Sequence, residues 1–164
     1  MILSAFTLLH VILSLVGIAS GFVVISSLLA SKPRAGWNTL FLVTTAATSM
    51  TGFLFPFHGF TPAIGFGIIS LLVLAIAILA RYRFGLAGGW SRTYAISAVI
   101  AQYLNFFVLV VQLFRRVPAL NDLAPTQSEP PFQITQLVVL ILFALLGIRA
   151  AMKFHGEPLR TAKA

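Results

Sequence analysis

The chain has 164 residues, of which 59% are hydrophobic and 9% charged, and its mean hydropathy is +1.01. Soluble domains carry about 25% charged residues, so this composition excludes an ordinary soluble domain and indicates an integral membrane protein. The formal net charge is +8, but the basic residues lie in short connectors and form no clustered patch, which argues against nucleic-acid binding. The chain has no cysteine, which excludes disulfides, thiolate metal sites and a cysteine nucleophile.

Five apolar segments follow one another along the chain, each of a length that suits a membrane crossing. We therefore expect an all-α integral membrane bundle of five transmembrane helices. It would form a single domain over residues 1–155, followed by a short basic cytoplasmic tail over 156–164. The expected spans are 3–30, 38–55, 63–80, 93–114 and 132–154. The first segment lacks the basic start of a signal peptide, so we expect it to be retained as a helix.

Small and special residues predict how these segments pack and where they end. Gly17 and Gly21 form a GxxxG pair, which allows the backbone of a neighbouring helix to approach closely. Residues 53–62 form a connector with four phenylalanines, two prolines and one histidine, but no acid, lysine or arginine. Four prolines in the loop over 117–131 argue against a helix through its middle.

The distribution of basic residues predicts the orientation. With five spans, nine of the eleven lysines and arginines fall on one side of the bilayer, and only Arg115 and Arg116 fall on the other. The positive-inside rule then places the N-terminus outside and the C-terminus in the cytoplasm. Trp37 and Trp90 would both lie at the cytoplasmic interface, where tryptophan is enriched.

Polar side chains gather in the outer half of the expected bundle. His10 lies about 10 Å below the outer end of the first segment, counting about 1.5 Å per helical residue. Thr48, Asn105 and Gln112 fall at outer depths of their own segments. They would lie beneath two outer loops that carry His58 and Glu129.

Two interpretations of this set remain open: interhelical hydrogen bonds that hold the bundle together, or the lining of an outward-facing polar pocket. Because intramembrane ionisable groups often mark functional sites, His10 is the sharpest ligand-binding candidate.

Three classes of function are weighed against these residues. The favoured one is a non-catalytic membrane protein, either an accessory subunit or a bundle that holds a small ligand or lipid. The alternative is a redox protein that binds b-type haem or a quinone, with His10 and His58 as haem ligands. Two nitrogen ligands of one metal lie about 4 Å apart, so this pairing requires the 53–62 connector to fold inward.

Transport and membrane enzymology have less support. Five spans cannot form two equal inverted halves, and no nucleophile with a base is evident, so we expect no enzymatic activity. Glu129, His58 and Asp122 have the side-chain types of an outer zinc site, but their spacing does not specify one. The expected partners are the lipid bilayer and a membrane protein or a second copy of the chain.

The stretches 55–62 and 124–132 resemble a group of small, uncharacterised polytopic inner-membrane proteins of bacteria, whose function is unknown. The resemblance implies a multi-pass protein of a bacterial inner membrane. It supplies no catalytic residues.

Overall fold

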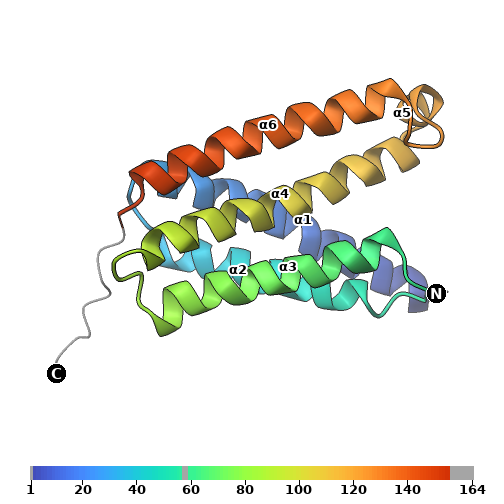
Figure 1. Cartoon of the computed structure of the whole chain (residues 1–164). Coiled ribbons are helices and arrows are strands. Elements are labelled where there is room, and N and C mark those ends of the chain that lie inside the picture. Colours follow the sequence, from blue (N-terminus) through green and yellow to red (C-terminus); the bar gives the residue numbers. More distant parts are fainter. Residues whose placement is uncertain (1, 57–58, 156–164) are drawn as a thin grey trace.

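The computed structural model describes residues 2–56 and 59–155 and has, over these residues, only helices and their connections. The prediction of an all-α bundle is confirmed (Figure 1). The elements are α1 (Ile2–Leu29), α2 (Ala35–Gly52), α3 (Pro62–Ile78), the π-helical turn η1 (Leu79–Arg83), α4 (Trp90–Arg116), α5 (Pro118–Leu123) and α6 (Pro130–Lys153).

Within residues 2–56 and 59–155, four helical segments are long and apolar enough to cross a membrane: α1, α3 with η1, α4 and α6. They define a polytopic membrane protein. The remaining long helix, α2, has 18 residues but carries Asn38, five threonines and a serine. Its crossing of the bilayer, and with it the count of five spans, stays a prediction.

Two helix limits differ from the expected spans because of local hydrogen bonding and proline. The third segment continues beyond residue 80 because η1 extends it to Arg83, where Phe84 N donates to Leu79 O at 3.0 Å. The loop after α4 begins with the short helix α5, which starts at Pro118. Proline is tolerated in a first helical turn because its missing N–H would have no partner there. The helix ends before Pro125.

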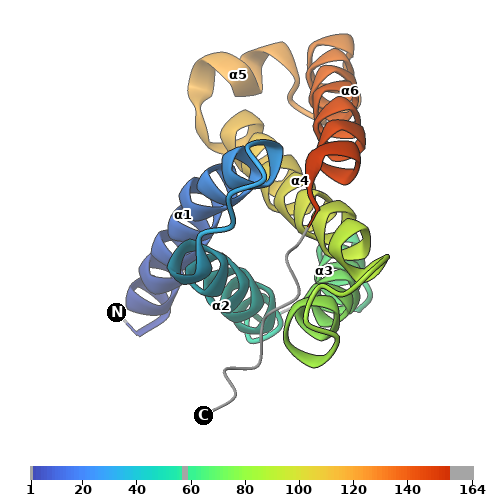
Figure 2. The same cartoon turned by 90° about the vertical axis from the view of Figure 1, so that its left-hand side faces the viewer.

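α4 is the central helix of the bundle, packed against α1, α3 and α6 (Figure 2). α2 completes the arrangement by packing against α1 and α3. The central position suits the sequence of α4, because Ala95, Ala98 and Ala101 are fully buried and let neighbouring helices approach.

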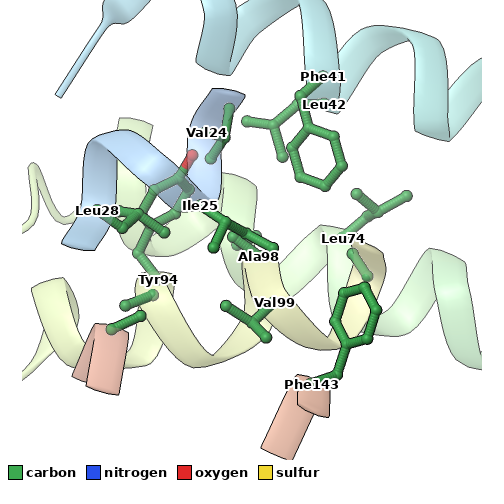
Figure 3. Packing of buried hydrophobic residues seen from close by; sticks show 14 of the residues in the cluster. Val24, Ile25, Leu28, Phe41, Leu42, Leu74, Tyr94, Ala98, Val99 and Phe143 are labelled. Carbon is green, nitrogen blue, oxygen red and sulfur yellow. The ribbon is translucent and has the colours of Figure 1, made fainter. Parts of the chain in front are cut away.

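Apolar side chains from α1, α2, α3, α4 and α6 meet in one core (Figure 3). Val24, Leu28 and Phe41 are completely buried there, beside Tyr94 of α4. Many large apolar side chains elsewhere remain exposed, among them Leu72 at 61%. In a bilayer these side chains face lipid, so the fold leaves an apolar outer surface.

The two ends of the bundle differ in charge. One end, which we call the basic end, comprises residues 30–36, 79–92 and 153–155, where α1, η1 and α6 end and α2 and α4 begin (Figure 1). Exposed basic side chains surround it: Lys32, Arg34, Arg83, Arg92 and Lys153. The opposite end carries α5 and the loop that precedes α6.

Candidate functional site

His10 is half-buried near the start of α1, beside a hydroxyl of α2 and the ring of Phe55. Its Nδ1 lies 2.8 Å from Thr51 Oγ1. Its ring meets the ring of Phe55 edge-on at 5.1 Å, and Phe6 packs on the same phenylalanine at 4.9 Å. His10, Thr51, Phe6 and Phe55 are called the His10 cluster below.

The hydrogen bonds of Thr51 fix the chemistry of this histidine. The single hydroxyl proton of Thr51 is donated to Ala47 O, at 2.7 Å. With that proton on a carbonyl of its own helix, Thr51 Oγ1 can accept from His10 in the tautomer that carries the proton on Nδ1. In the neutral imidazole the other nitrogen, Nε2, is then the acceptor. Among the described residues it has no hydrogen-bond partner, so a lone pair is available to a donor or a metal.

The amide side chains of α4 connect helices. Asn105 Nδ2 donates to Thr45 Oγ1 of α2 at 3.1 Å, and Gln102 Nε2 donates to Ile18 O of α1 at 2.8 Å. Thr48 donates to the carbonyl of Thr44 in its own helix, at 2.8 Å. The bonds of Asn105 and Gln102 are interhelical, as the helix-packing interpretation describes, whereas that of Thr48 stays within α2.

The remaining candidates lie at the end of the bundle opposite the basic end. Gln112 is exposed and lines, with Arg115 and Arg116, a shallow hollow of about 350 Å³. Glu129 Oε1 accepts from Thr126 Oγ1 at 2.7 Å and from the Thr126 amide at 3.2 Å. The hydrogen bond from the Thr126 hydroxyl is the main cause that lowers the pKa of this carboxyl below its ordinary value.

Within the described part of the chain, no hydrogen bond joins two of the six predicted ligand-binding residues. His58 lies outside the described residues, so its pairing with His10 or Glu129 is a prediction that these contacts leave open. No group of three or more histidine or acidic side chains is gathered within the described ranges.

Arg81 was not predicted as a site residue. It was counted only among the nine basic residues that predict the orientation. Its side chain is 5% exposed, and its Nε and Nη1 have no hydrogen-bond partner among the described residues. A signal was present, because residues 70, 74, 77 and 81 repeat at the spacing of one helix face. The first three are Ser70, Leu74 and Ala77, all buried, and the same face carries the arginine into the bundle.

No protein-family model, curated protein or solved structure gives a match to this chain. The fold and composition define its class, a polytopic all-α membrane protein. No family is identified, and the resemblance to bacterial inner-membrane proteins remains an expectation from the sequence.

Proposed function

We propose that this protein is a non-catalytic membrane protein that holds a small ligand or lipid group at the His10 cluster. The observation that carries the proposal is the 2.8 Å contact between His10 Nδ1 and Thr51 Oγ1, which holds the ring in place. In the tautomer with the proton on Nδ1, Nε2 of the partly buried ring is an acceptor without a partner in the described residues. A ligand with a hydroxyl or N–H group suits this acceptor, and the rings of Phe6 and Phe55 suit an apolar body beside it.

The alternative function is a redox protein that binds quinone or b-type haem at the same residue. The available Nε2 favours it, because a neutral imidazole nitrogen is a haem ligand and accepts hydrogen bonds from a quinol hydroxyl. The expected second ligand, His58, is predicted from sequence only. A quinone needs no second histidine and is therefore the simpler form of this alternative.

The proposal includes a topology. We infer that α2 also crosses the membrane, because polar side chains near both of its ends and at its middle are hydrogen-bonded to other helices. Asn38 bonds Tyr94 at the basic end, Thr45 bonds Asn105 midway, and Thr51 bonds His10 at the far end. With five spans and the basic end in the cytoplasm, the His10 cluster would lie in the outer leaflet. A bacterial inner membrane is the proposed location.

The test is gentle purification in lipid nanodiscs, followed by mass spectrometry and an absorbance spectrum of what remains bound. We expect a bound molecule in the wild type and in His155→Ala, an exposed histidine at the basic end, and its loss in His10→Leu. Thr51→Val should reduce retention because it removes the partner of Nδ1. Equal composition of all four preparations would contradict the proposal. A Soret band or a quinone mass lost with His10 would select the redox alternative.

A further inference from the structure

Arg81 is a buried cation whose surroundings in the described residues supply no anion. Its guanidinium carbon lies 5.6 Å from the ring centres of both Tyr82 and Tyr94. Such cation–π contacts offset part of the cost of removing the charge from water. They do not satisfy the N–H donors, and Nε and Nη1 have no partner. A buried guanidinium in this state requires hydrogen-bonding acceptors.

Helix α2 holds the two tyrosine rings that flank the guanidinium. The Tyr94 hydroxyl donates to Asn38 Oδ1, and Asn38 Nδ2 in turn donates to Arg34 O at 2.8 Å. On the other side, the Tyr82 hydroxyl lies 3.0 Å from Thr39 Oγ1. Both rings that flank Arg81 are therefore held by the first turns of one helix, so the cation occupies a prepared position.

The chain itself offers little to neutralise this charge. It has three acidic residues, and two of them, Asp122 and Glu129, lie at the opposite end of the bundle. The third, Glu157, lies outside the described residues. Around Arg81, the exposed charged side chains of the basic end are lysines and arginines. The local field therefore favours an anion that comes from outside the protein.

The depth of Arg81 indicates where that anion comes from. Trp37, Tyr82 and Trp90 are exposed by 43%, 54% and 38% at the same end, and such aromatic side chains are typical of the headgroup level of a bilayer. Two of the three guanidinium nitrogens, Nε and Nη1, are enclosed by the protein, and the third, Nη2, is not. An oxyanion at headgroup depth can therefore reach the guanidinium from that side.

We propose that Arg81 binds the phosphate of an anionic phospholipid at the basic end of the bundle. A guanidinium suits this role because Nη2, the nitrogen that is not enclosed, can donate a charge-assisted hydrogen bond to a phosphate oxygen. Basic pockets between transmembrane helices on the cytoplasmic side are known places for acidic headgroups. The ligand class is a lipid phosphate, which is distinct from the ligand proposed for the His10 cluster.

The test compares Arg81→Gln with Arg83→Gln, an exposed arginine two residues away that serves as the matched control. Each protein is delipidated in detergent and mixed with phosphatidylglycerol, phosphatidylcholine or inorganic phosphate. Bound lipid is counted by native mass spectrometry, and thermal unfolding is recorded. We expect phosphatidylglycerol alone to be retained and to raise the unfolding temperature in wild type and Arg83→Gln. Retention of phosphatidylglycerol should fall about tenfold in Arg81→Gln, because this variant loses a charge-assisted hydrogen bond to the phosphate.

Several results would overturn the proposal. Equal losses in Arg81→Gln and Arg83→Gln would indicate general surface attraction, and an equal response to inorganic phosphate would remove the lipid assignment. If Glu157→Gln lowers the unfolding temperature and phosphatidylglycerol has no effect on wild type, the tail carboxylate is the counter-ion. Should Arg81→Gln fail to fold, Arg81→Lys keeps the charge but lacks the Nη2 donor. Undiminished lipid retention by that variant would likewise refute the proposal.

Discussion

Gly21 of α1 lies directly against the amide of Gln102, and replacing it with alanine should disturb the centre of the bundle. An added Cβ would stand 1.9 Å from Gln102 Oε1, 2.4 Å from its Cδ and 2.9 Å from Phe41 Cε2. Since Gln102 is completely buried, its side chain can move only by giving up its hydrogen bond to Ile18 O.

The cost of Gly21→Ala follows from three terms. Overpacking a filled core costs about 1–3 kcal/mol, and the lost interhelical hydrogen bond costs about 0.6–1.7 kcal/mol. The higher helix propensity of alanine returns about 0.5–1 kcal/mol. We therefore expect the free energy of unfolding to fall by about 2 kcal/mol.

The assay is denaturant unfolding in mixed micelles, followed by tryptophan fluorescence, with Gly147→Ala as the matched control. At Gly147 of α6 an added Cβ would meet Val99 Cγ1 at 3.5 Å, an ordinary contact, so the control should be neutral or slightly stabilising. A double-mutant cycle with Gln102→Ala should show a favourable coupling. If Gly21→Ala is as stable as Gly147→Ala, or if the cycle shows no coupling, the reasoning about close approach fails.

Three further predictions concern other parts of the chain. Tyr94→Phe should lower the free energy of unfolding by about 1 kcal/mol, because Asn38 Oδ1 loses its donor; unchanged unfolding would contradict this. Thr126→Val should raise the pKa of Glu129 toward its ordinary value, measured by NMR titration of the carboxyl. The pKa of Glu129 is lowered in the folded protein, so its carboxylate stabilises the loop at pH values above the ordinary pKa. This stabilisation is lost as the pH falls through the folded pKa. A Glu129 titration in Thr126→Val identical to that of the wild type would contradict the prediction. Gly36→Cys, in a chain without cysteine, should react with an impermeant maleimide only after cell lysis, and labelling of intact cells would reverse the proposed orientation.

The sequence allowed the helical class and the membrane environment to be predicted, because apolar runs of this length suit the interior of a bilayer and little else. The ends of the helices were harder to predict from the sequence. The π-helical turn after Ile78 and the helix that begins at Pro118 depend on local hydrogen bonding that hydropathy does not record. Sequence also identified His10 as unusual, since a histidine inside an apolar run is rare.

The partners of polar residues could not be predicted from depth alone. Asn105 and Gln112 lie about two turns apart on one side of α4, yet Asn105 bonds α2 whereas Gln112 is exposed. The difference depends on which helices lie beside each turn. Arg81 shows the opposite error, because its charge suggested a loop residue although its helix spacing continues a buried face. Reading charge and periodicity together would have identified it.

The hydroxyl-rich character of α2 has a consequence for how the protein is made. α2 is synthesised before α4, which supplies the partners of Asn38 and Thr45. Until those residues emerge from the ribosome, the polar groups of α2 lack these interhelical bonds, and the helix is less apolar than its neighbours. If α2 crosses the membrane as proposed, its stable integration should wait for α4. In a chain truncated before residue 90 and released from the ribosome, α2 should then be accessible to an aqueous labelling reagent, whereas in one truncated after residue 116 it should be protected.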